Sequence, residues 1–236
     1  MTLFISSCQA PNSKTLVIGH RGARGHVAEN TLASISKAIE LGVDGVEIDV
    51  FRCATGELVV FHDKTLDVLT NGTGYIEQMP LDSIKQFLVL GKEPIPTLNE
   101  VMDLIDGTIQ LNIELKGTQT AVLTSELIEH YFETSNWEAK NIFISSFDWN
   151  ELDQFYKVNQ KVAIAVLTED DPIDAIPVAK RLAAFAINPD FKSLTEANVE
   201  KIHKAGFNVY PWTVNEPEDI ERMIAIGVDA LITDFP

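Results

Sequence analysis

Two acidic side chains stand two residues apart in the apolar segment Gly45-Val-Glu-Ile-Asp-Val50. Side chains two apart on a β-strand point to the same face, so Glu47 and Asp49 share one face of a strand expected at 45–51. On a strand that is buried on both faces, two bare carboxylates are costly unless their charge is compensated. Carboxylate oxygens are ligands for Mg2+ or Ca2+, so the pattern favours a divalent-cation site. The alternative is a pair of solvated charges on an exposed strand face.

A second segment, Leu111-Asn-Ile-Glu-Leu-Lys116, has the same alternation. Asn112, Glu114 and Lys116 share one face of the expected strand. Glu114 could complete an oxygen site with three carboxylates, and Lys116 could meet the anion that such a metal attracts. The alternative is an internal Glu–Lys pair that neutralises itself. Two charged faces that both turn inward favour the metal site.

Two histidines follow short apolar runs and are expected at the carboxyl ends of strands. His20 comes after Leu16-Val-Ile18 and one glycine, and His62 comes after Leu58-Val-Val-Phe61. An unperturbed histidine titrates near pH ~6.5, so this pair could serve as general base and acid. Arg21 can fork onto a phosphate or a carboxylate. The alternative, a hydrogen-bonding role only, is preferred for the three histidines with no acidic cluster in register: His26, His130 and His203.

Apolar runs that alternate with helical segments would position these side chains. Strands are expected at 15–19, 45–51 with 58–62 close behind, 110–115, 142–145, 162–167, 183–187, 207–213 and 230–233. Helices are expected at 31–41, 98–105, 120–131, 150–157, 195–204 and 217–226. Gly42, Gly206 and Gly227 would end three of these helices, and Asn30 or Thr31 would begin the first.

This alternation predicts an α/β protein with a parallel sheet that is covered on both faces. An open doubly wound sheet and a (β/α)8 TIM-type barrel both satisfy it. No Gly-x-Gly-x-x-Gly motif opens a helix after the first strand, and 236 residues fit a barrel, so the barrel is favoured. Residues 15–236 are expected to form one catalytic barrel domain. Turn signals in 63–96 indicate a small insertion after the second strand, with one short helix near 81–90.

Composition excludes several classes of protein. The formal charge of −17 argues against a nucleic-acid partner, which would need a basic surface. No apolar run is long enough for a transmembrane helix. Cys8 and Cys53 are the two cysteines, too few for a disulfide framework.

Residues 1–14 are treated as an N-terminal tail. The stretch Ile5-Ser-Ser-Cys8 resembles the end of a bacterial lipoprotein signal, in which the cysteine is lipidated. The resemblance predicts a lipid anchor at Cys8, a longer basic and apolar start in the native gene, and a location in the cell envelope or periplasm. The alternative is an incidental cysteine in a cytoplasmic protein.

Taken together, these motifs resemble the glycerophosphodiester phosphodiesterase family. The resemblance extends from about residue 15 to the C-terminus. It is carried by His20-Arg-Gly22, Ala28-Glu-Asn-Thr31, Glu47-x-Asp49, Val59-Val-Phe-His-Asp63, Ile95-Pro-Thr-Leu-x-Glu100, Asn112-x-Glu-x-Lys116, Ser146-Phe147, Trp212-Thr-Val-Asn215 and Gly227-Val-Asp-Ala-Leu-Ile-Thr-Asp-Phe-Pro236.

The resemblance implies metal-dependent hydrolysis of glycerophosphodiesters to glycerol 3-phosphate and an alcohol. It implies the following roles: His20 and His62 as the acid/base pair; Glu47, Asp49 and Glu114 as ligands to one Mg2+ or Ca2+; Arg21 and Lys116 near the phosphate; Phe147 and Trp212 against the glycerol or the leaving group. One alternative, a lysophospholipase D-like or cyclising phosphodiesterase that acts on lipids, would use the same residues. A second alternative, of a different class, is a non-catalytic phosphate-binding barrel.

Overall fold

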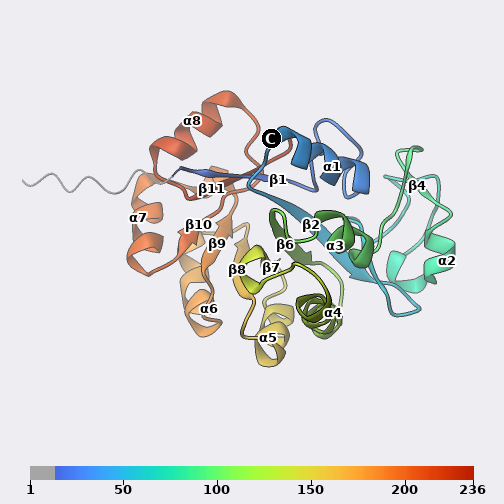
Figure 1. Cartoon of the computed structure of the whole chain (residues 1–236). Coiled ribbons are helices and arrows are strands. Elements are labelled where there is room, and N and C mark those ends of the chain that lie inside the picture. Colours follow the sequence, from blue (N-terminus) through green and yellow to red (C-terminus); the bar gives the residue numbers. More distant parts are fainter. Residues whose placement is uncertain (1–13) are drawn as a thin grey trace, which may run out of the picture.

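Eight parallel strands form a nearly closed barrel in the computed structural model, which describes residues 14–236 (Figure 1). The strands are β1 (Leu16–Gly19), β2 (Gly45–Arg52), β6 (Gln110–Leu115), β7 (Ile142–Ser146), β8 (Ala163–Thr168), β9 (Ala186–Pro189), β10 (Asn208–Val209) and β11 (Ala230–Thr233). Their order in the sheet is β10-β9-β8-β7-β6-β2-β1-β11. Backbone N–H groups of Asp229 and Ile232 donate to the carbonyls of Val209 and Pro211, each at 3.0 Å, and so join the two ends of the sheet. The predicted TIM-type barrel is confirmed.

Helices cover the outside of the barrel (Figure 1). They are α1 (Leu32–Leu41), α3 (Leu98–Ile105), α4 (Thr120–Thr134), α5 (Trp149–Val158), α6 (Ile176–Arg181), α7 (Glu196–Lys204) and α8 (Pro217–Ala225). On β2, Val46, Ile48 and Val50 belong to the same buried core as the apolar side chains of α1 and α3. The alternating residues Glu47 and Asp49 therefore point to the barrel interior.

Helix ends follow local chemistry, and of the two candidates for the start of the first helix the structure has Thr31. Thr31 is the N-cap of α1, and its side chain accepts from the Ser34 N–H. Asn30, the other candidate, does not cap this helix, because its side chain is bound to Asp49. Gly42 ends α1 with a left-handed φ of 81°.

Several further boundaries differ from expectation, and the strand expected at 207–213 is shortened to β10. Helix α6 was missed because Pro177 resembles a helix breaker, but it lies in the first turn, where a proline has no hydrogen bond to lose. The strand expected at 183–187 is displaced to β9, since Ala183 has a φ of 48° and belongs to the preceding turn. The helix expected near 81–90 is a single turn, α2 (Leu81–Ile84), and the chain then pairs β4 (Leu88–Val89) with β5 (Glu93–Pro94).

A small lobe stands beside the barrel (Figure 1). It is built on β3 (Leu58–Val60), which runs antiparallel to β2, and it includes the 3-10 turn η1 (Ile76–Gln78), α2 and the β4–β5 pair. The lobe has its own buried apolar cluster, which includes Phe51, Phe61 and Leu66. Strand β3 carries the chain back toward the barrel mouth, where it delivers His62.

The predicted lipid anchor at Cys8 lies outside the described residues and stays a prediction, as does the envelope location. No helix within residues 14–236 combines the length and apolar character that a membrane crossing requires.

Replacing Thr97 with alanine should lower the free energy of unfolding by about 0.5–2 kcal/mol. Thr97 caps α3: its hydroxyl accepts from the Glu100 N–H at 3.2 Å, while the Glu100 carboxylate accepts from the Thr97 N–H at 2.7 Å. Urea unfolding of the wild type, Thr97→Ala and Thr97→Ser measures this effect. The serine variant should retain most of the stability, and an unchanged midpoint in the alanine variant would contradict the capping role.

Candidate active site

A pocket opens at the carboxyl end of the barrel strands. Its wall is formed by His20, Arg21, Arg24, Glu47, His62, Asn112, Glu114, Lys116, Ser145, Phe147, Leu167, Glu169, Trp212, Thr213 and Ile232. Active sites of barrel enzymes lie at this end. Eight of the nine residues predicted for the site line this one pocket, and the ninth, Asp49, is buried beside Glu47 and Glu114.

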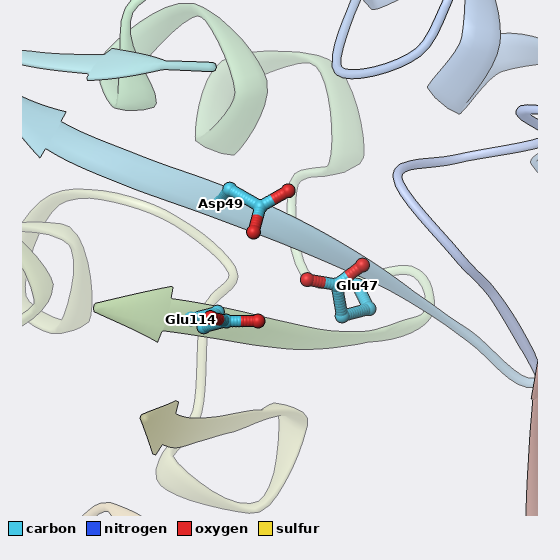
Figure 2. Close-up of side chains that lie close together, drawn as sticks. All are labelled: Glu47, Asp49 and Glu114. Atoms are coloured by element: carbon cyan, nitrogen blue, oxygen red, sulfur yellow. The ribbon is translucent and has the colours of Figure 1, made fainter. Parts of the chain in front are cut away.

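Three carboxylates converge at the floor of the pocket (Figure 2). Glu47 and Asp49 come from β2, and Glu114 comes from the adjacent β6, where it is in register with Asp49. Each residue offers an oxygen within 4.8 Å of those of the other two, and all three residues are buried. Burial and the charges of Asp49 and Glu114 raise the pKa of Glu47 well above its usual range. Burial, with the charge of Asp49, likewise raises the pKa of Glu114 to about 8.

The donor set fits a hard divalent cation. Glu47 Oε2 accepts from the Arg21 N–H at 2.9 Å, but Glu47 Oε1 is buried and has no hydrogen-bond partner within residues 14–236. A buried carboxylate oxygen without a partner is costly. Three converging carboxylates supply the oxygen ligands that Mg2+ and Ca2+ prefer. The chemistry of these residues therefore suits one such ion.

Asn30 holds the Asp49 carboxylate in place. Its amide donates to Asp49 Oδ2 at 2.8 Å, and its oxygen accepts from the Asp49 N–H at 3.2 Å. Asn30 is fully buried and has a φ of 56°, a backbone region that asparagine enters more readily than most residues.

Removing the Asn30 side chain should weaken ion binding by about 10–100-fold, the effect typical of groups that orient metal ligands. Asn30→Gly is the informative variant, because glycine keeps the left-handed backbone and loses only the amide. Asp106→Gly is a matched control, with a φ of 44° at the end of α3 and away from the pocket. Calorimetric titration with Mg2+ or Ca2+ measures the effect. Equal affinities in Asn30→Gly and the wild type would refute this role.

Each site histidine is oriented by a carboxylate at its Nδ1. His20 Nδ1 lies 2.6 Å from Asp234 Oδ1, and His62 Nδ1 lies 2.6 Å from Asp63 Oδ1. Asn215 fixes Asp234 by donating to its second oxygen at 2.9 Å. These contacts place the Nδ1 proton toward the carboxylate and leave Nε2 of each ring as an acceptor. Arg21 Nε donates to His20 Nε2 at 3.3 Å. Burial lowers the pKa of His20 below its ordinary value, although its hydrogen bond to Asp234 opposes this.

His62 reaches the site by a route that differs from the expected one. It was expected at the end of a parallel barrel strand, but β3 is antiparallel to β2. Phe61 N donates to the Asp49 carbonyl at 3.0 Å, which brings the next residue level with the acidic floor.

Two basic side chains border the carboxylates. Arg21 Nη1 donates to Glu29 Oε1 at 2.5 Å, and Arg21 Nε lies 3.4 Å from Asp49 Oδ2. Lys116 Nζ lies 3.2 Å from Glu114 Oε1 and 3.2 Å from His62 Nε2. Burial alone would lower the pKa of Lys116, but the charges of Glu114 and Asp49 outweigh it and raise the pKa.

An aromatic wall faces these charges. The Phe147 and Trp212 rings pack edge to face, with centroids 5.3 Å apart and planes at 87°. Trp212 Nε1 donates to the Asn188 carbonyl at 2.9 Å, which fixes the indole.

Sequence reasoning missed the residues that support the site. These are Glu29, Asn30, Asp63, Asn215 and Asp234 as orienting groups, and Arg24, Ser145 and Glu169 in the pocket wall. Several of them lie inside the motifs quoted above, but nothing in their spacing shows which side chain each would contact.

Known proteins resemble this chain in both architecture and sequence. Residues 20–236 match the model of the glycerophosphoryl diester phosphodiesterase family. A glycerophosphodiester phosphodiesterase from Caldanaerobacter subterraneus is 38% identical over 94% of this chain and 95% of its own. A protein of the same name from Bacillus altitudinis is 31% identical over 94% and 95%.

A solved structure agrees with these relatives. The Oleispira antarctica phosphodiesterase, determined with its product sn-glycerol-3-phosphate, superposes with a TM-score of 0.84 at 30% identity over 94% of this chain and 93% of its own. The barrel, the converging side chains and these matches lead to one conclusion. The chain belongs to the glycerophosphoryl diester phosphodiesterase family and is an enzyme.

Proposed function

We propose that this enzyme hydrolyses glycerophosphodiesters to glycerol 3-phosphate and a free alcohol, with one divalent cation, Mg2+ or Ca2+, as cofactor. The observation that carries the proposal is that two carboxylate-oriented histidines, Arg21 and Lys116 line one pocket together with the buried trio of carboxylates, of which Asp49 lies just behind the pocket wall. The glycerol 3-phosphate bound by the Oleispira antarctica enzyme supports the same substrate class here.

Glu47, Asp49 and Glu114 would hold the cation. When bound, the cation would supply positive charge that stabilises the charge developing on the phosphoryl oxygens. Arg21 and Lys116 would bind and orient the phosphate from the two sides of this trio. The aromatic wall would exclude water from one side of the substrate.

In the proposed reaction His20 acts as the base and His62 as the acid. The lowered pKa of His20 keeps its Nε2 unprotonated near neutral pH, where it can take a proton from the nucleophile, either water or the neighbouring glycerol hydroxyl. As the nucleophile bonds to phosphorus and the bond from phosphorus to the leaving oxygen breaks, His62 Nε2 gives its proton to that oxygen. If the nucleophile is the glycerol hydroxyl, water then opens the resulting cyclic phosphate to give glycerol 3-phosphate. Asp63 beside Nδ1 holds the His62 ring so that Nε2 points away from it.

A substrate comparison tests this function. The purified protein should release glycerol 3-phosphate from glycerophosphocholine with a higher kcat/KM than it shows for release of choline from lysophosphatidylcholine. The reverse order would favour the lipid-directed alternative. Turnover of neither diester at any ion concentration would favour a non-catalytic phosphate-binding barrel.

The ion requirement should depend on pH. Without an ion, Glu114 has a pKa of about 8 and therefore carries a proton at lower pH, which an ion must displace. The concentration of Mg2+ or Ca2+ for half-maximal activity should rise as pH falls from 8 to 6, by up to about tenfold per pH unit for one displaced proton. Ion titrations at pH 6, 7 and 8 measure this dependence. A constant half-maximal concentration would show that no proton is displaced.

A further inference from the structure

In the machinery proposed above, the aromatic side of the pocket only excludes water and has no part in selecting the alcohol. Arg21 follows β1 and Lys116 follows β6, the two strands that flank β2. Phe147, Glu169 and Trp212 lie in the segments that follow β7, β8 and β10, on the other part of the ring. A diester whose phosphate lies over the carboxylate floor can therefore extend one of its two alcohols toward Phe147, Glu169 and Trp212.

Glu169 brings an unbalanced negative charge to this side. It is exposed at the pocket, and within residues 14–236 its carboxylate makes no hydrogen bond or ion pair. Asp170 and Asp171 follow it, and residues 162–179 contain no lysine or arginine. The basic side chains of the pocket are already paired, for example Arg24 with Glu29 at 2.6 Å. The charge of Glu169 is therefore available to a positively charged ligand.

The aromatic rings add to this attraction. Phe147 is 38% exposed, and Trp212 is held by its bond to the Asn188 carbonyl. The faces of aromatic rings attract cations, tryptophan most strongly, and quaternary ammonium groups are bound in this way. An aromatic pair and a carboxylate without a partner in the same pocket suit an ammonium group, whether methylated or not.

We propose that Glu169, with Phe147 and Trp212, forms a subsite for a positively charged alcohol moiety of the substrate. The enzyme then prefers diesters of amino alcohols, such as glycerophosphocholine and glycerophosphoethanolamine, to diesters of neutral alcohols such as glycerophosphoglycerol. This inference rests on the proposed function. It adds the class of alcohol that the enzyme prefers and the residue that selects this alcohol.

The test is the ratio of kcat/KM for glycerophosphocholine to that for glycerophosphoglycerol. The wild-type ratio should exceed one, and Glu169→Gln, which keeps the shape and removes the charge, should lower it roughly three- to tenfold. Glu169→Lys should lower it further. A wild-type ratio of one or less would overturn the subsite. So would an unchanged ratio in Glu169→Gln, the outcome expected if Glu169 contacts the glycerol common to both substrates.

Asp170→Asn is the matched control, because Asp170 is exposed next to Glu169 but does not line the pocket. The kcat/KM ratio of Asp170→Asn should equal that of the wild type. An equal fall of the ratio in Asp170→Asn and Glu169→Gln would assign the effect to the general negative charge of the pocket rim and overturn the subsite. Failure of the wild type on both diesters contradicts the proposed function itself. Turnover of both diesters with an unaltered ratio in Glu169→Gln contradicts only the subsite.

Discussion

Replacing His20 with alanine should reduce kcat/KM for glycerophosphocholine by roughly 10²–10⁴-fold, the usual contribution of general acid–base catalysis. His20 is half-buried, its Nδ1 is bound to Asp234, and its pKa is lowered by burial, so no neighbouring group can readily replace it. Steady-state kinetics at saturating ion concentration measure the loss. Asp234→Asn should lower activity in the same direction, because Asp234 holds the ring in place.

Two comparisons make this result interpretable. His62→Ala should show a loss of similar size, and the double variant should lose far less than the product of the single losses, as groups that act in one step do. His130→Ala, an exposed histidine on α4, should behave like the wild type. Near-normal turnover by either site variant would remove that histidine from the mechanism.

Replacing Glu47 with glutamine should abolish most activity and most ion binding while the barrel stays folded. The substitution preserves volume and can keep the hydrogen bond from the Arg21 N–H, but it removes a charged ligand from the trio. We expect at least about a 100-fold loss of ion affinity, since even groups that only orient ligands contribute 10–100-fold. Excess Mg2+ or Ca2+ should restore part of the activity.

Thermal unfolding separates this effect from damage to the fold. An ion at about 100 times its Kd stabilises a protein by about 2.7 kcal/mol. For a chain of this size that corresponds to a rise in Tm of roughly 5–10 °C. The wild type should show the rise, and Glu47→Gln should lack it at the same concentration. Because the variant loses a buried carboxylate repelled by its neighbours, its ion-free Tm should equal or exceed that of the wild type. An equal rise in both proteins would contradict the role of Glu47.

The barrel and the acidic floor were predictable because each depends on a local, periodic signal. Alternation on β2 and β6 determines that Glu47, Asp49 and Glu114 share the inward face, and parallel pairing then brings Asp49 and Glu114 into register. His20 followed from its place at the end of β1. For each of these four side chains, the position along one strand was enough to predict where the side chain lies.

Contacts between segments far apart in the sequence could not be predicted from the position of a residue along one strand. Asn30 and Asp49 are 19 residues apart, and His20 and Asp234 are 214 residues apart. Those contacts depend on the loop conformation at Asn30 and on the closure of the barrel at β11. The antiparallel direction of β3 was missed for the same reason, since an apolar run of three residues shows its strand character but not its direction.

The most direct test of metal-dependent hydrolysis is release of glycerol 3-phosphate from glycerophosphocholine before chelation, after exhaustive chelation, and after Mg2+ or Ca2+ is returned. We expect glycerol 3-phosphate and choline in equal amounts, loss of both products on chelation, and recovery when the ion is restored. Undiminished release of glycerol 3-phosphate by the chelated protein would contradict the assignment of Glu47, Asp49 and Glu114 as the ligands of a required metal ion.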